Sequence, residues 1–189
     1  MDRYASRVAL DADGRTLTYG ELDRSANQLA HHLSARGVRP GSYVGVLLAR
    51  GIDVHVALLA VLKAGAAYVP LDPECPADRV AQIARTSNMR LLLSHQPLAA
   101  LAQSAGCEVV LLDAERASID ALSTERLQNG VRRPIDPAYA IFTSGSTGEP
   151  KGVSISLCSL AHFVRAEASV FDVRPDDRVY QGFSLAFDA

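Results

Sequence analysis

The stretch from Ala140 to Gly152 carries the residue types in this sequence that are best suited to hold an anion. An apolar run leads into four hydroxyl side chains, three glycines and a lysine: Thr143, Ser144, Gly145, Ser146, Thr147, Gly148, Lys151 and Gly152. Glycines let backbone N–H groups approach an anion, hydroxyl groups donate hydrogen bonds, and lysine supplies positive charge. Together they indicate a loop that holds a polyphosphate.

Two familiar phosphate-binding motifs do not fit this stretch. A Walker loop needs glycine directly before its lysine and Ser or Thr directly after it, whereas Lys151 lies between Pro150 and Gly152. A dinucleotide fingerprint needs GxGxxG, and Gly145 to Gly148 supply only GxxG. A flexible Ser/Gly surface loop would explain the composition, but it would not explain the ordered Pro-Lys-Gly ending. The loop therefore indicates a different class of phosphate-binding protein.

Four segments of the chain resemble core motifs of one enzyme superfamily. The string TSGSTGEPKG at 143–152 resembles the phosphate loop of adenylate-forming enzymes, which include acyl-CoA synthetases, luciferases and the adenylation domains of nonribosomal peptide synthetases. LTYGEL at 17–22 resembles their first core motif. LKAGAAYVPLDP at 62–73 resembles the second, in the form typical of amino-acid activation, and FDA at 187–189 resembles the start of the fourth. These matches are collinear, and the chain as a whole resembles a peptide-synthetase adenylation domain.

The resemblance implies a two-step reaction. An amino acid is activated by ATP as aminoacyl-AMP with release of pyrophosphate, and its acyl group then passes to the phosphopantetheine thiol of a carrier protein. ATP and Mg²⁺ are the implied cofactors, with the magnesium ligand expected outside this chain. The residues implied to hold or shape the site of the β- and γ-phosphates are Thr143, Ser144, Gly145, Ser146, Thr147, Gly148 and Lys151.

Asp188 is the residue implied to recognise the substrate. In the family the matching aspartate pairs with the α-ammonium group of the amino acid, which an acyl or aryl acid lacks. The sequence itself places this carboxylate after Phe187 at the end of an apolar run, where a buried charge would need a partner. An ordinary surface aspartate is the alternative, because charged side chains are mostly exposed.

One position departs from the family pattern. Related sequences commonly carry a histidine four residues after the valine that matches Val153, and this chain has Leu157 there. His162 lies five residues further on and is expected on a helix face rather than as a substitute. The departure affects the packing beside the loop and not the phosphate-binding residues.

The resemblance also implies an extent. Residues 1–189 would be the N-terminal portion of the adenylation domain, with later core motifs and the C-terminal subdomain absent, so no catalytic residue is assigned. We therefore expect the isolated chain to make no adenylate and to self-associate, since an incomplete sheet leaves apolar faces uncovered. An acyl- or aryl-CoA synthetase and a non-catalytic phosphate-binding or interaction module remain alternatives, and the amino acid cannot be read.

Composition excludes several other classes. With 48% hydrophobic and 21% charged residues the chain is globular, and its net charge of −2 gives no reason to expect nucleic acid as a partner. The purest apolar run, Val56 to Leu62, is too short for a membrane span, and no apolar signal core precedes it. Cys75, Cys107 and Cys158 have no metal-ligand spacing, and no HExxH pair occurs, so we expect a cytoplasmic protein with reduced thiols and no metal site.

Alternating helix and strand patterns must position these residues. They predict an α/β fold with a largely parallel, doubly wound sheet and flanking helices, an incomplete part of the large N-terminal subdomain of an adenylate-forming enzyme. The expected elements are a hairpin turning at Asp13-Gly14, a helix from the Thr18–Glu21 capping box to Gly37, strands at 43–48, 67–71, 91–93, 109–112 and 138–142, helices at 54–62, from Pro76 to Ala84, between 93 and 109 and at 159–170, and an irregular connection at 113–137.

Overall fold

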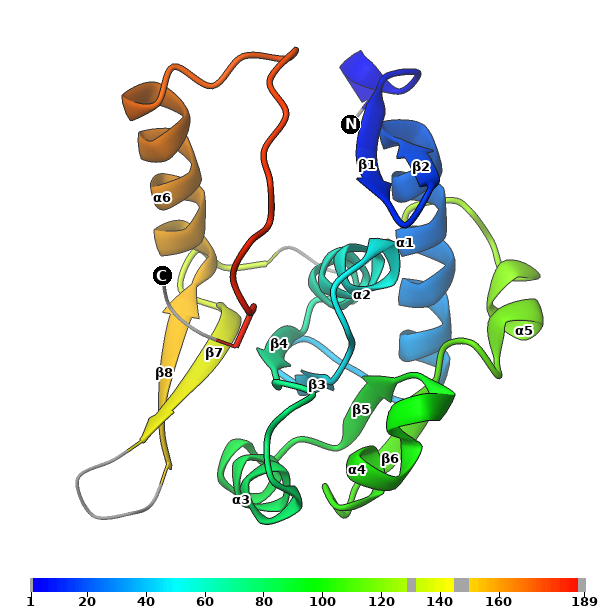
Figure 1. Cartoon of the computed structure of the whole chain (residues 1–189), viewed down its shortest axis with the longest axis vertical. Coiled ribbons are helices and arrows are strands. Elements are labelled where there is room, and N and C mark those ends of the chain that lie inside the picture. Colours follow the sequence, from blue (N-terminus) through cyan, green and yellow to red (C-terminus); the bar gives the residue numbers. More distant parts are fainter. Residues whose placement is uncertain (1, 129–131, 145–149, 187–189) are drawn as a thin grey trace.

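A computed structural model describes residues 2–128, 132–144 and 150–186, with Ser144 described by its backbone alone. Its centre is a sheet of six strands, with helices on both faces and a small hairpin packed beside them (Figure 1). The strands follow the spatial order β6-β5-β3-β4-β7-β8. Their bounds are β3 Tyr43–Val46, β4 Ala67–Pro70, β5 Leu91–Ser94, β6 Glu108–Leu111, β7 Pro137–Ser144 and β8 Pro150–Ser156.

Every neighbouring pair in this sheet is parallel except the last, β7 with β8, which is antiparallel. The strands at its centre are buried on both faces: all four residues of β5 are buried, as are Val44 and Val46 of β3. Such strands read as continuous apolar runs because helices cover both sides of a parallel sheet. The prediction of a largely parallel sheet is confirmed.

Helices lie on both faces of the sheet, so the doubly wound arrangement is also confirmed. On one face α1 (Tyr19–Ala35) and α2 (Ile52–Lys63) bury the larger apolar cluster, which includes Leu29, Leu33 and Val61. On the other face α3 (Ala77–Ser87) and α4 (Ala99–Gln103) bury a second cluster around Val80 and Leu92. The remaining helical segments are η1 (Asp2–Tyr4), η2 (Gln96–Leu98), α5 (Arg116–Asp120) and α6 (Leu157–Val170).

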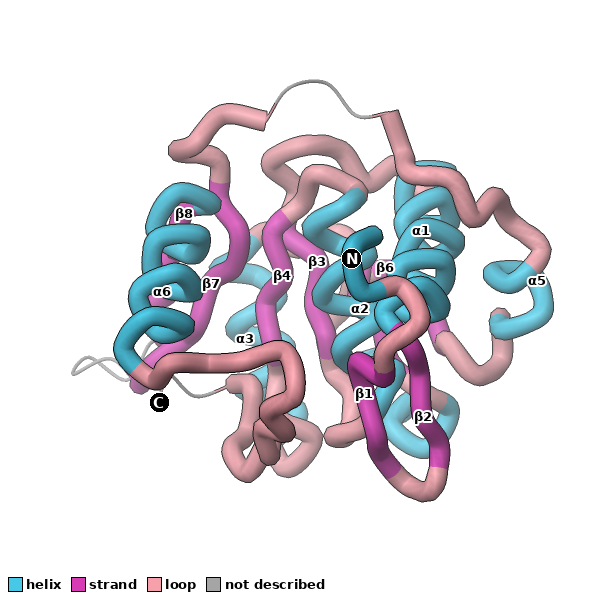
Figure 2. Tube along the Cα trace, turned by 90° about the horizontal axis from the view of Figure 1, so that it is seen from above, coloured by secondary structure: helices cyan, strands magenta, loops and turns pink. Residues whose placement is uncertain are grey.

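The N-terminal elements form as their local sequence predicts. Strands β1 (Val8–Ala12) and β2 (Arg15–Thr18) form an antiparallel hairpin, which lies alongside the helical layer (Figure 2). The capping box at the start of α1 is present: the Glu21 backbone N–H donates to Thr18 Oγ1 at 3.2 Å, and the Thr18 N–H donates to the Glu21 carboxylate at 2.8 Å. These bonds satisfy backbone donors that a helix start otherwise leaves unpaired.

Two local predictions need correction. The short helix α5 lies within 113–137, which was predicted to be irregular, and Ile119 on it is buried against the α1–α2 cluster. Strand β8 was not predicted at all, because residues 150–156 show little apolar alternation and most of them are exposed. Pairing with β7 forms this strand, since the ladder satisfies the backbone groups of both segments.

Helix α6 begins at Leu157, two residues before the predicted start at Ser159. The reason is a cap: Ser156 Oγ accepts a hydrogen bond from the Ser159 N–H at 3.2 Å. None of the helices in the described part of the chain combines the length and the apolar character needed to cross a membrane.

Candidate functional site

Strand β7 brings the predicted phosphate loop to one edge of the sheet. It runs parallel to β4, with Tyr139 in register with Tyr68. The two rings stack with centroids 5.3 Å apart and planes 13° from parallel. Burial, with Tyr139 next to it, raises the pKa of Tyr68 to about 12, so this phenol stays neutral. Because β7 is parallel to β4, residues 143 and 144 end at the same edge as the carboxyl ends of β3 and β4.

The β7–β8 register brings two of the predicted phosphate-binding residues together. Thr143 is paired with Lys151, and Ser144 with Pro150. Residues directly opposite in an antiparallel pair have their side chains on the same face, with Cβ atoms roughly 5 Å apart. Both Thr143 and Lys151 are exposed, and the ammonium group has no ion-pair partner among the described residues. A hydroxyl donor and a cation thus lie side by side, on the two strands that residues 145–149 connect.

The other predicted site residues are not placed. Gly145, Ser146, Thr147, Gly148 and Asp188 lie outside the described residues, and nothing is described of the Ser144 side chain. Their roles remain predictions. The two residues that are placed fit a phosphate group, since phosphate oxygens accept hydrogen bonds from hydroxyl and ammonium donors.

Gly152 allows the loop end of this hairpin to pack closely against the Phe142 ring. It is paired with Phe142, and a Cβ on Gly152 would lie 2.7 Å from the Phe142 ring. The ring therefore occupies the space above the glycine while Phe142 packs against the α3–α4 cluster. A side chain at position 152 would push the ring away, so glycine at this position allows the hairpin beside Lys151 to stay packed.

The residues around the start of α6 agree with the reading of the sequence. Leu157 is half-buried, and its N–H donates to the Asp136 carbonyl at 2.9 Å. His162 lies on the exposed surface of α6, as expected of a helix-face residue.

Cys75 and Cys107 are half-buried free thiols, and burial raises the pKa of each. Within 2–128, 132–144 and 150–186, no three His, Cys, Asp or Glu side chains come together in a way that could hold a metal ion.

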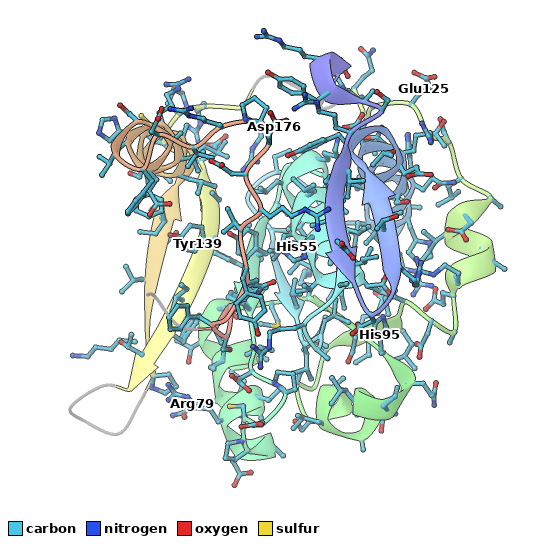
Figure 3. All side chains as sticks on the ribbon, turned by 45° about the horizontal axis from the view of Figure 1, so that its top comes forward. His55, Arg79, His95, Glu125, Tyr139 and Asp176 are labelled. Atoms are coloured by element: carbon cyan, nitrogen blue, oxygen red, sulfur yellow. The ribbon has the colours of Figure 1, made fainter. Side chains whose placement is uncertain are left out.

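A cavity of about 530 Å³ lies at the carboxyl ends of β3 and β4. The chain leaves β3 for α2 on one face of the sheet and leaves β4 for α3 on the other. Such a change of side is where open α/β sheets commonly bind ligands. Residues 182–186 form one wall of the cavity. This C-terminal segment descends between Tyr139 and His55 in Figure 3.

Charged residues beside this cavity were missed as functional candidates in the sequence. Asp72 accepts a 2.6 Å hydrogen bond from Ser184 Oγ and a 2.9 Å bond from the Glu74 N–H, while Arg50 donates to the Gly182 carbonyl at 3.0 Å. The hydrogen bond from Ser184 is the main reason that the pKa of Asp72 is lowered. A carboxylate directly after a buried strand is the signal in the sequence, where Asp72 appears only as part of the second core motif at 62–73.

Comparison with known proteins agrees with this fold. The family model described as "AMP-binding enzyme" matches residues 1–189. Phosphinothricin tripeptide synthetase PhsC of Streptomyces viridochromogenes is 46% identical over 191 residues, covering 98% of this chain and 17% of the relative. Tyrocidine synthase 1 of Brevibacillus parabrevis is 40% identical over 190 residues, covering 100% of this chain and 17% of the relative.

Solved structures lead to the same family. The nonribosomal peptide synthetase FmoA3, bound to alpha-methyl-L-serine-AMP, superimposes with a TM-score of 0.88 at 36% identity, covering 98% of this chain and 20% of that chain. Its AMPPNP-bound form gives a TM-score of 0.87 at 35% identity, covering 98% and 19%. This chain therefore spans about a fifth or less of the length of these relatives. With a family model matched along its whole length and a fold that agrees, the chain belongs to the AMP-binding enzyme family.

Proposed function

We propose that the gene product containing this chain activates an amino acid with ATP as aminoacyl-AMP and passes it to a carrier-protein thiol in nonribosomal peptide synthesis. The observation that carries the proposal is the juxtaposition of Thr143 and Lys151 on the β7–β8 hairpin. The relatives support it: tyrocidine synthase 1, phosphinothricin tripeptide synthetase PhsC, and a nonribosomal peptide synthetase bound to alpha-methyl-L-serine-AMP. Residues 1–189 would then be the N-terminal portion of the adenylation domain.

In this reaction the amino-acid carboxylate attacks the α-phosphate, a new C(O)O–P bond forms, and the bond to the leaving pyrophosphate breaks. Negative charge therefore grows on the β- and γ-phosphates. Lys151 and Thr143 would stabilise that charge through an ammonium group and a hydroxyl donor that the hairpin already holds together. Mg²⁺ would neutralise further phosphate charge, with its ligand proposed outside this chain.

Lys151→Ala tests this role. Loss of one charge-assisted contact is expected to cost roughly 1.5–3 kcal/mol, or about 10- to 150-fold in kcat/KM for ATP. The measurement is amino-acid-dependent exchange of pyrophosphate into ATP by the whole gene product. Lys151→Arg, which keeps the charge, should retain more activity than alanine. Unchanged exchange in Lys151→Ala would remove this residue from the site.

Asp188→Ala tests the substrate class. If its carboxylate pairs with the substrate ammonium in a dry pocket, removing it leaves a buried charge unpaired at a cost of about 3–5 kcal/mol. Activation of α-amino acids should fall by orders of magnitude, whereas a des-amino analogue should lose much less. Equal losses for both ligands would make Asp188 structural. A wild-type preference for aryl or fatty acids would favour the acyl- or aryl-CoA synthetase alternative.

The 189-residue chain by itself is proposed to bind phosphate without making adenylate, because later motifs of the family would be missing. Catalytic groups that act as a unit lose nearly all activity when some are removed. Detectable aminoacyl-AMP from the purified chain would contradict this. Pyrophosphate binding by a whole gene product that shows no exchange with any carboxylic acid would favour the non-catalytic alternative.

A further inference from the structure

The segment 182–186 is attached to the sheet mainly by polar contacts. Ser184 Oγ donates to Asp72 Oδ2 at 2.6 Å, across 112 residues of sequence, and Arg50 Nη1 donates to the Gly182 carbonyl at 3.0 Å. Leu185 adds an apolar contact with the α1–α2 cluster, while Phe183 is 73% exposed and contributes little packing. The two polar contacts come from the residues that follow β3 and β4.

The cavity explains why these contacts matter. About 530 Å³ of space separates this segment from the carboxyl ends of β3 and β4. Apart from Leu185, the segment gains little of the close packing that fixes side chains in a protein core. Its position therefore depends on hydrogen bonds that bridge the rim of the cavity.

Asp72 is well suited to act as an anchor. It follows directly on Leu71, which is 4% exposed, so its backbone is held by the sheet. Its second oxygen, Oδ1, accepts from the Glu74 N–H at 2.9 Å, which fixes the carboxylate and leaves Oδ2 aimed at Ser184. Arg50 lies close enough for its charge to help keep the Asp72 pKa low, so the acceptor is ionised near neutral pH.

We propose that Asp72 and Arg50 are positioning residues for amino-acid recognition, because they hold the segment that leads into Asp188. This inference rests on the proposed function. Asp188 is the fourth residue after Ser184, a span of at most about 14 Å of extended chain. If Asp188 pairs with the substrate ammonium as proposed, releasing Ser184 would free the segment that precedes it and weaken that pairing. The β7–β8 hairpin is held by backbone pairing with β4 and would not depend on the Asp72–Ser184 hydrogen bond.

Steady-state pyrophosphate exchange by the whole gene product tests the proposal with Asp72→Ala, Ser184→Ala and the double variant. Asp72→Ala should raise KM for the amino acid about tenfold, the size expected for one hydrogen bond to a charged group, with KM for ATP nearly unchanged. Ser184→Ala should act in the same direction. The double variant should be no worse than Asp72→Ala, because both remove the same bond. Asp72→Asn, which keeps an acceptor oxygen, should recover part of the loss.

The control is Asp78→Ala, an exposed carboxylate in the first turn of α3 whose loss should leave both KM values unchanged. Equal rises in KM for ATP and amino acid after Asp72→Ala, or additive effects in the double variant, would overturn the proposal.

A second readout separates this inference from the proposed function. In the 189-residue chain, Asp72→Ala should speed amide hydrogen exchange across residues 182–186 and leave the β7–β8 hairpin unchanged. If the wild-type gene product activates no amino acid, the proposed function fails, and this measurement still decides whether Asp72 anchors the segment. Unchanged exchange in these residues would refute the anchoring.

Discussion

Two regions of this molecule use apolar residues in opposite ways. In the N-terminal body, residues 2–128, helices α1 and α2 bury Leu29, Leu33 and Val61 between themselves and the sheet. In the C-terminal arm, residues 157–186, every residue from 161 to 180 is exposed. Figure 1 shows α6 set apart from the helices of the body. The large apolar side chains exposed in the arm are Phe163, Val164, Val170, Phe171, Val173, Val179, Tyr180 and Phe183.

The contrast shows that an apolar helix pattern does not by itself produce burial. Both α2 and α6 are rich in apolar residues, but α2 lies on the sheet while α6 has no buried residue. The stability of the body comes from its own packing. The arm is mostly exposed to solvent. Polar contacts such as the ion pair of Arg7 with Asp176, at 2.8 Å, join it to the body. Mutations should therefore have very different effects in the two regions.

The largest expected difference is between buried and exposed apolar side chains. Leu33→Ala in the body should lower the free energy of unfolding by about 2–5 kcal/mol, because it leaves a cavity in a fully buried cluster. Val164→Ala in the arm, where the side chain is 55% exposed, should change it by less than about 0.5 kcal/mol. Urea denaturation at neutral pH measures both. Similar losses would show that the arm is as tightly packed as the body.

A smaller difference in the free energy of unfolding is expected between a charged pair in the body and one in the arm. In the body, a 3.0 Å hydrogen bond from His95 and the charge of Arg116, at 2.7 Å, lower the pKa of Asp53 to about 2. Since this pKa is below the unfolded value, Asp53 stabilises the fold above pH 4 and loses that contribution as pH falls towards 2. Asp53→Asn should therefore cost about 2 kcal/mol at pH 7 and flatten the fall in stability between pH 4 and pH 2.

The matched change in the arm is Asp176→Asn. Its carboxylate is paired with Arg7, and both side chains are exposed, so the pair should add little to folding. Urea denaturation across the same pH range compares the two variants. An effect of Asp176→Asn as large as that of Asp53→Asn would contradict the division into a packed body and a surface arm.

The last prediction concerns self-association through the arm, where substitutions should have the smallest effect on folding stability. Exposed apolar groups gathered on one region favour contact between copies of the 189-residue chain. Replacing Phe163 and Val164 with serine should lower the average mass in sedimentation at high protein concentration and leave the urea midpoint nearly unchanged. An unchanged mass distribution would place any self-association elsewhere on the chain.

Local sequence was sufficient for much of the fold. The capping box of Thr18 and Glu21 predicted the start of α1, and the apolar run at 91–93 predicted a strand buried on both faces. These features depend on neighbouring residues and on simple periodicity, so a single sequence carries them. The phosphate-loop prediction rests on the same kind of local signal, a continuous string at the end of a strand.

Tertiary structure decided what depends on distant partners. Strand β8 exists because β7 satisfies its backbone, Thr143 meets Lys151 through that register, and Asp72 meets Ser184 across 112 residues. Sequence alone determined the family and the alternating α/β elements, and the phosphate-binding role of the loop stays a prediction from sequence. Which polar groups pair, and which apolar faces are covered, was settled only by folding, because both depend on how sheet and helices pack and not on the residues next to them in the chain.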